Sequence, residues 1–179
     1  MFLSEITYRS LTLRDVERLQ DIDASQHIGS AWRDINGERL LVVIDYHDPD
    51  WPNGFADHRQ RLQATIEGGG AAIGAFASSG RLVGFVTVNL QLFGAKNTYA
   101  LLDQLFISAE YRRQGVGRQL FAMAAAAGKR FGADRLYIAA GSAEETVAFY
   151  RALGCVDAVE INGRIFEEDP RDLQLEYVL

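Results

Sequence analysis

Apolar and polar residues between residues 71 and 140 alternate between the spacing of strands and the spacing of a helix. Continuous or alternating apolar residues predict strands at residues 71–77, 81–90, 99–107 and 136–139. Ser78-Ser79-Gly80 is a turn sequence, so the first two strands are expected to form a hairpin. Before the last strand, apolar residues at helical spacing predict a helix that ends near Gly132: Val116, Leu120, Phe121, Met123, Ala124 and Ala127.

The first third of the chain has fewer strand signals. Ile6 and Tyr8 suit a first strand, and Thr12 followed by Asp15 resembles a capping box that opens a helix. One strand is predicted at residues 39–46, followed by a proline-bearing loop. A helix is predicted at residues 55–67, where Gly68 ends it. We therefore expect this region to be helical with one inserted strand.

The last part of the chain predicts a helix and two closing strands. The helix covers residues 146–153 and ends at Gly154, and strands follow at residues 156–161 and 173–178. Asn162-Gly163 is read as a turn. The order of elements, without repeats or linkers, predicts a single α/β domain over residues 1–179.

Composition and charge narrow the class of protein. Of 179 residues, 48% are hydrophobic, and 18 Lys and Arg against 24 Asp and Glu give a net charge of −6, which argues against a broad nucleic-acid surface. Cys155 is the one cysteine, so an internal disulfide is excluded. Residues 1–14 lack a signal-peptide pattern, and the apolar run at 121–127 is too short to cross a membrane, so we expect a cytoplasmic protein.

The loop before the long helix has the composition of an anion site. Gly115 and Gly117 allow the backbone to turn several N–H groups toward one point at a helix N-terminus, and Arg112, Arg113 and Arg118 add positive charge. A diphosphate would suit such a loop, although a glycine pair in this position is also common in purely structural turns. The spacing matches neither the Walker loop nor the dinucleotide-binding fingerprint.

The same segment, Arg112-Arg113-Gln114-Gly115-Val116-Gly117, resembles the Gln/Arg-x-x-Gly-x-Gly/Ala motif of the GNAT N-acetyltransferases. The likeness extends over residues 71–155, and the C-terminal segment FEEDPRDLQLEYVL resembles a bacterial subgroup whose substrates are mostly unassigned. The resemblance implies a mixed, curved, mostly antiparallel sheet flanked by helices. A V-shaped opening between two parallel strands of that sheet would hold acetyl-CoA.

The resemblance also implies how the cosubstrate is held. The backbone of Leu105, Phe106 and Ile107 would pair with the pantetheine arm, and a bulge near Phe106 would aim one N–H at the thioester oxygen. Ala143 stands where the family often has a CoA-binding Asn, so this contact is either lost or supplied by Ser142. The expected cofactor-binding loop and helix start consist of Arg112, Arg113, Gln114, Gly115, Val116, Gly117 and Arg118.

Two residues are candidates for proton transfer. Tyr150 matches the family tyrosine that protonates the leaving thiolate; without the resemblance it reads as a core aromatic of its helix. An alkylamine with a pKa of about 10.4 is about one part in a thousand neutral at pH 7, so a base would help. Asp103, expected on the same strand face as Leu105 and Ile107, is the candidate base, and a solvent-facing carboxylate is the alternative.

Other candidates are weaker. The spacing of His27, His47 and His58 does not suggest a metal site, and Cys155 is expected to pack in the core. Trp51, with nearby Asp45, Asp48 and Asp50, forms an acidic aromatic loop that could attract a cationic amine or could be merely solvated. We therefore expect an acetyl-CoA-dependent N-acetyltransferase acting on a small-molecule or peptide amine without a metal, nucleic acid or membrane. A non-catalytic acyl-CoA-binding module is the alternative, and dimerisation through the closing strands stays open.

Overall fold

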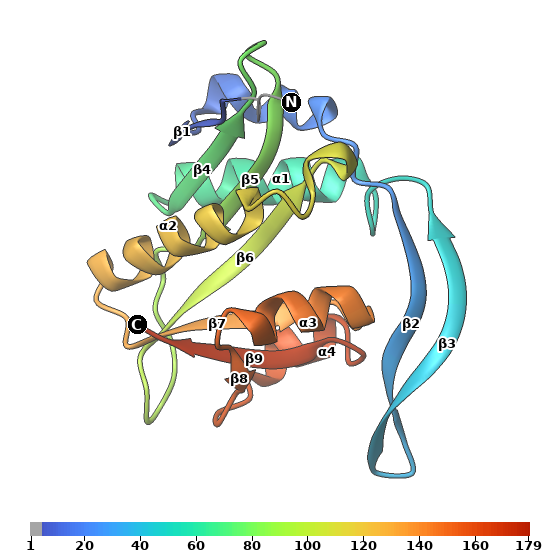
Figure 1. Cartoon of the computed structure of the whole chain (residues 1–179). Helices are drawn as coiled ribbons and strands as arrows, with labels where there is room; N and C mark the ends of the chain where they lie inside the picture. Colours follow the sequence, from blue (N-terminus) through green and yellow to red (C-terminus); the bar gives the residue numbers. More distant parts are fainter. Residues whose placement is uncertain (1–4) are drawn as a thin grey trace.

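The computed structural model describes residues 5–179, so the first four residues of the segment screened for a signal peptide lie outside it. A seven-stranded sheet forms the centre of the protein, in the order β1-β4-β5-β6-β7-β9-β8 (Figure 1). The sheet confirms the predicted α/β class with mostly antiparallel pairing. Its strands are β1 (Thr7–Ser10), β4 (Ala71–Phe76), β5 (Leu82–Val88), β6 (Tyr99–Ile107), β7 (Arg135–Ala140), β8 (Val156–Asp157) and β9 (Leu173–Val178).

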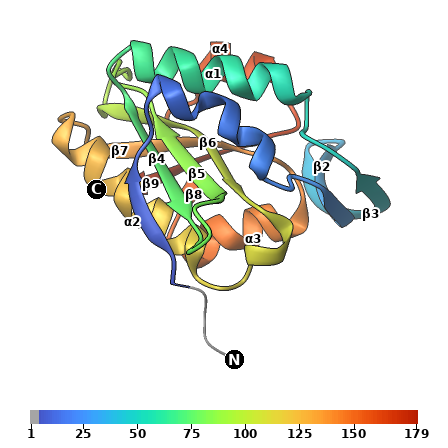
Figure 2. The same cartoon turned by 90° about the horizontal axis from the view of Figure 1, so that it is seen from above.

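Helices cover both faces of this sheet (Figure 2). The 3₁₀ helix η1 (Leu13–Asp21), α1 (Phe55–Glu67) and α4 (Gly163–Glu168) lie on one face, and α2 (Val116–Arg130) and α3 (Glu144–Ala152) on the other. Apolar positions of α2 such as Leu120 and Ala124 are fully buried, as their spacing predicts. Leu19 and Leu62 are likewise fully buried under η1 and α1, which gives the sheet a core on each side.

The sheet splits between its two parallel strands. β6 pairs with β7 only over Tyr99–Leu101 and Arg135–Tyr137. Beyond Leu101, β6 continues to Ile107 beside β5, whereas β7 continues to Ala140 beside β9. The two strands therefore diverge, and residues 102–107 of β6 have no strand on the side that faces β7 (Figure 1).

A long two-stranded hairpin stands beside this split. It consists of β2 (Gln26–Ile35) and β3 (Glu38–Asp48), so the prediction of a helical first third with one strand is wrong. β2 escapes a pattern search because its sequence, QHIGSAWRDI, does not alternate. Its backbone docks on the loop after β7, where the N–H of Trp32 donates to the carbonyl of Ser142 at 2.8 Å.

The C-terminal region differs from the expectation in two places. The predicted strand at residues 156–161 is only the two-residue β8, and α4 was not predicted. Asn162 is the N-cap of α4 and accepts a hydrogen bond from the N–H of Ile165 at 3.1 Å, so Asn162-Gly163 starts a helix instead of forming a turn. α1 has the predicted bounds, and α3 begins two residues before the predicted start.

Between residues 5 and 179, no helix is both long enough and apolar enough to cross a membrane.

Candidate active site

The loop before α2 presents a run of unpaired backbone donors. Arg113 and Gly115 have positive φ values of 60° and 86°, which turn the chain sharply into the helix. Within the described part of the chain, the N–H groups of residues 113–118 make no hydrogen bond, and the N–H of Gln119 is the first to bond back into the helix. Such a run at a helix N-terminus favours an anion.

The three arginines near this loop have different surroundings. Arg113 and Arg118 are exposed, and neither forms an ion pair among residues 5–179. Arg112 instead turns back to β6, where its Nε donates to the carbonyl oxygen of Ile107 at 3.0 Å. Burial lowers the pKa of Arg112 from its ordinary value. Arg113 and Arg118 are thus free to meet an anion, whereas Arg112 is bound to the strand.

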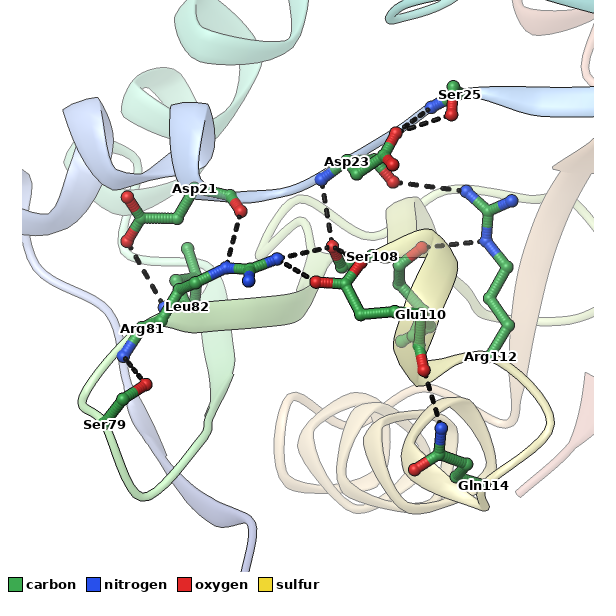
Figure 3. A network of polar contacts seen from close by, with 11 residues as sticks. Asp21, Asp23, Ser25, Ser79, Arg81, Leu82, Ser108, Glu110, Arg112 and Gln114 are labelled. Carbon is green, nitrogen blue, oxygen red and sulfur yellow. Dashed lines mark hydrogen bonds and ion pairs between the residues drawn. The ribbon is translucent and has the colours of Figure 1, made fainter. Parts of the chain in front are cut away.

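A polar network fixes the start of this loop (Figure 3). Ser108, the first residue after β6, accepts hydrogen bonds through Oγ from the N–H of Asp23 at 2.9 Å and from Arg81 at 3.2 Å. Arg81 also pairs with Glu110, whose carbonyl accepts from the side chain of Gln114 at 2.6 Å. The loop is therefore tied to the connection after η1 and to the turn between β4 and β5.

The free edge of β6 has an alternating set of open backbone groups. The N–H of Ser108 donates to the carbonyl of Val83 at 2.8 Å, so Phe106 is also in a hydrogen-bonded pair with β5. Leu105 and Ile107, in non-bonded pairs, direct their N–H and C=O groups to the split. The N–H of Phe106 is thus directed to β5, and the candidates for the catalytic N–H are those of Leu105 and Ile107. The carbonyl of Ile107 is already bonded to Arg112.

The bulge in β6 is at Asp103. Val88 pairs with Leu102 and Thr87 pairs with Gln104, so Asp103 is the extra residue, and the expectation of a bulge near Phe106 is wrong. The extra residue reverses the alternation, so Asp103 points to the face of α1. The expected common face with Leu105 and Ile107 is therefore also wrong, since these two pack against the core on the α2 side.

Arg61 of α1 holds the carboxylate of Asp103. Its Nη2 lies 2.6 Å from Oδ1 of Asp103 and its Nε lies 3.2 Å from Oδ2, and Nη2 also donates to the Asp103 carbonyl at 3.1 Å. Asp103 is therefore a largely buried partner in an ion pair and not a free strand-end carboxylate. An amine could reach it only by displacing or sharing Arg61, which weakens the case for Asp103 as the base.

Tyr150 lies in the core of the α2–α3 face. Only 6% of the residue is exposed, and its ring packs edge-on against Phe121 and Phe149. Burial raises the pKa of its phenol, so Tyr150 is protonated at neutral pH and has a proton to donate. Cys155 is also buried, and burial raises the pKa of its thiol to about 12, which suits a packing role.

Several other sequence candidates have structural partners. Ser142 accepts a hydrogen bond through Oγ from Arg33 of β2 at 2.7 Å, so it links the hairpin to the loop after β7. Trp51 is 6% exposed and its ring lies 5.0 Å from that of Phe106, so the indole is a core element and does not face solvent. His58 is buried as well, bonded to Gln104 at 2.8 Å.

The groups that could take part in binding or catalysis lie around the split. β6 and the loop before α2 offer backbone donors, α3 brings Tyr150, and α1 brings Arg61. The profile of the Acetyltransferase (GNAT) family matches residues 40–155. The chain belongs to the GNAT acetyltransferase family. The likeness of its last residues to a bacterial subgroup of that family stays a prediction.

Solved acetyltransferase structures share this fold over nearly the full chain. Nourseothricin acetyltransferase has a TM-score of 0.72 and 19% identity, with 97% of this chain and 98% of that chain covered. A Bacillus anthracis protein assigned as a streptothricin acetyltransferase, solved with acetyl coenzyme A, has a TM-score of 0.71 and 17% identity, with 98% of each chain covered. PaiA N-acetyltransferase from Thermoplasma acidophilum, solved with coenzyme A, has a TM-score of 0.61 and 17% identity, with 98% and 99% covered.

At these identities the structural likeness establishes the fold alone. No curated protein matches the sequence. Among residues 5–179, no three His, Cys, Asp or Glu side chains are grouped so that they could hold a metal ion.

Sequence reasoning missed two charged residues at the split. Arg61 lies on a helix whose sequence indicates only an amphipathic surface, and no pattern connects it to Asp103, 42 residues later. Asp172 directly precedes β9, whose Leu173 pairs with Ala140 at the end of β7, on the other wall of the split. In the sequence it stands in DPRD, which has the composition of a solvated turn.

Proposed function

We propose that this GNAT acetyltransferase binds acetyl-CoA as its cosubstrate and transfers the acetyl group directly to a primary amine. One observation carries the proposal: the unpaired N–H groups of residues 113–118 lie next to the open edge of β6. A diphosphate needs the first feature, and an extended amide-bearing arm needs the second. The described residues therefore fit the diphosphate and the pantetheine arm of coenzyme A.

Each part of the site then has a role. The donors of residues 113–118, with Arg113 and Arg118, bind the diphosphate, and the open groups of Leu105 pair with the pantetheine arm. An N–H that faces the split, from Leu105 or Ile107, donates to the thioester oxygen and stabilises the negative charge that develops there. Arg112 and Ser142 act indirectly, since their polar groups are bound to β6 and to the hairpin.

Tyr150 is the proposed acid. Its phenol is neutral at pH 7 and lies on α3, which borders the split, so it can donate its proton to the thiolate that leaves. Because a thiol has a pKa of about 8.5, a thiolate is already an adequate leaving group near neutral pH. The expected contribution of Tyr150 to turnover is therefore modest, roughly tenfold to a hundredfold.

The acceptor is proposed to be a cationic amine. The two walls of the split carry Asp103 and Asp172 on the α1 and α4 side, and two of the structural neighbours are named for nourseothricin and for streptothricin. We propose that residues 1–179 act as one domain. Dimerisation through β8 and β9 stays a prediction.

Calorimetry and thiol release test the proposal together. Purified protein is titrated with acetyl-CoA and with CoA, and thiol release is then followed with L-lysine, spermidine and streptothricin. Saturable binding followed by amine-dependent release of thiol is expected. Binding without release from any amine would favour the non-catalytic acyl-CoA module, and no binding would overturn both functions.

A further inference from the structure

Two carboxylates lie on the two walls of the split, on the same side of the sheet. Asp103 lies on the β6 wall and points to α1, where it meets Arg61. Asp172 lies on the opposite wall, one residue before Leu173, which packs in the core on the α2 and α3 side. Alternation along the chain turns Asp172 to the other face, which is the face that α1 and α4 cover (Figure 2).

Burial of Asp172 and the negative charge of Asp169 raise the pKa of its carboxyl, and the positive charges of Arg171 and Arg61 lower it. Arg61, which is bonded to Asp103 on the other wall, is therefore also close enough to act on Asp172. The net result raises the pKa of Asp172 from 3.8 to about 6. Asp172 is therefore a stronger base than an ordinary aspartate and is still mostly ionised at pH 7.

The charged groups around Asp172 come from four elements. Asp169 and Arg171 after α4 and Arg61 on α1 act on Asp172 itself. The others act on these neighbours: Asp57 on α1, Asp103 on β6 and Glu168 on α4 act on Arg61, and Arg33 on β2 acts on Asp169. Most of the positive groups are already paired, because Arg61 holds Asp103, Arg171 holds Asp169 at 2.8 Å, and Arg33 donates to Ser142. Asp172 has no ion-pair partner within 4.0 Å among the described residues.

We propose that Asp172 is the general base that removes a proton from the acceptor ammonium group, and that the Arg61–Asp103 pair positions that group from the opposite wall. The inference rests on the proposed acetyl transfer. It follows from the difference between the carboxylates: both oxygens of Asp103 are occupied by one guanidinium, whereas Asp172 is partly buried beside the split with no direct cationic partner.

The protons and bonds balance. The ammonium R–NH₃⁺ gives one proton to the carboxylate of Asp172, and the neutral nitrogen then attacks the thioester carbonyl. A C–N bond forms and the C–S bond breaks. Tyr150 gives its proton to the departing thiolate and takes up the second nitrogen proton in its place. The third nitrogen proton stays on the amide. Asp172 returns its proton to water after the product has left.

The sharpest readout is the pH dependence of kcat/KM. With an internal base, the reactive form combines ionised Asp172 with the ammonium ion, so kcat/KM is expected to rise up to about pH 6 and then form a plateau. Asp172→Asn removes the base, so only amine that is already neutral reacts. For this variant we expect kcat/KM near pH 7 to fall by about a hundredfold to a thousandfold and to rise tenfold per pH unit from pH 5 to pH 9.

Three variants control for structural effects. Asp172→Glu keeps a carboxylate and is expected to restore the plateau. Asp103→Asn frees Arg61 and is expected to raise KM while keeping the plateau. Glu167→Gln removes an exposed charge from α4 and is expected to change neither parameter. Calorimetry with acetyl-CoA should give the same affinity for all of them.

The outcomes separate this inference from the proposed function. If the Asp172→Asn variant turns over with the same plateau, the role of Asp172 is overturned and acetyl transfer is left intact. If the native protein does not bind acetyl-CoA, or shows no turnover, the transfer itself is contradicted.

A second measurement does not depend on turnover. In protein labelled with carboxyl-¹³C aspartate, the resonance of Asp172 is the one that Asp172→Asn abolishes. Its titration midpoint should lie near pH 6 and shift to lower pH when spermidine is added. A midpoint below pH 4.5, or no response to spermidine, also overturns the inference.

Discussion

Replacing Gly115 by Asp tests the anion-binding loop against a control at the other end of the same helix. Gly115 and Gly132 flank α2 with φ values of 86° and 91°, and a Cβ added at either position meets no atom within 4 Å. Gly115→Asp and Gly132→Asp therefore impose the same left-handed backbone strain and the same added charge. Only Gly115 belongs to the loop whose N–H groups are unpaired.

The expected effects differ in kind. The left-handed strain costs each variant about 1 kcal/mol, which corresponds to a fall in Tm of about 2–4 °C for a chain of this size. The helix dipole favours a carboxylate at the N-terminal Gly115 and disfavours one at the C-terminal Gly132, so Gly132→Asp should lose more stability than Gly115→Asp. A carboxylate about 4 Å from a phosphate costs about 4 kcal/mol at an effective dielectric constant of about 20. For Gly115→Asp we therefore expect affinity for CoA to fall roughly a thousandfold.

Calorimetric titration of both variants with CoA, together with thermal unfolding, measures the two effects. Gly132→Asp should lose stability and keep native affinity, whereas Gly115→Asp should lose both. Equal CoA affinities in the two variants would refute the assignment of this loop as the diphosphate site.

The other substitutions address the acid, a buried aromatic and an acid-sensitive contact. Tyr150→Phe should lower kcat roughly tenfold to a hundredfold with unchanged CoA affinity, and a parallel loss of affinity in calorimetry would show a structural role instead. Trp51→Ala should reduce the free energy of unfolding in urea by about 3–5 kcal/mol, because it empties the space beside Phe106; a loss below about 1 kcal/mol would contradict its core position. Glu160 accepts hydrogen bonds from the backbone N–H groups of residues 95–97, which lower its pKa from 4.5 to about 2. Its contribution to stability is thus complete above pH 4.5 and disappears as the pH falls through about 2, so Glu160→Gln should lower Tm at pH 7 and have little effect near pH 2.

The central β6–α2–β7–α3 segment could be predicted from the sequence because its apolar periodicity is strong and its helices end at glycines. β2 could not, since its ten residues contain a glycine and polar runs without alternation. α4 was missed because Asn162-Gly163 reads equally well as a turn, and only the side-chain bond from Asn162 to Ile165 distinguishes a helix cap.

The side chains of the candidate site were also harder to predict from the sequence than its backbone loop. Its backbone loop follows from glycine spacing, but the face of Asp103 depends on a bulge, and one inserted residue leaves no mark in an alternating pattern. The ion pair between Arg61 and Asp103 joins positions 42 residues apart, and Asp172 reaches the split only because β9 pairs with β7. Long-range pairing of this kind requires the folded chain.

Acetyl transfer itself is tested most directly by thiol release from acetyl-CoA with and without an amine, with the product mass determined in the same sample. We expect release that depends on L-lysine, spermidine or streptothricin and a matching mass increase of one acetyl group on that amine. Release at the same rate without any amine, or none with all three despite saturable binding of acetyl-CoA, would contradict the proposed transfer.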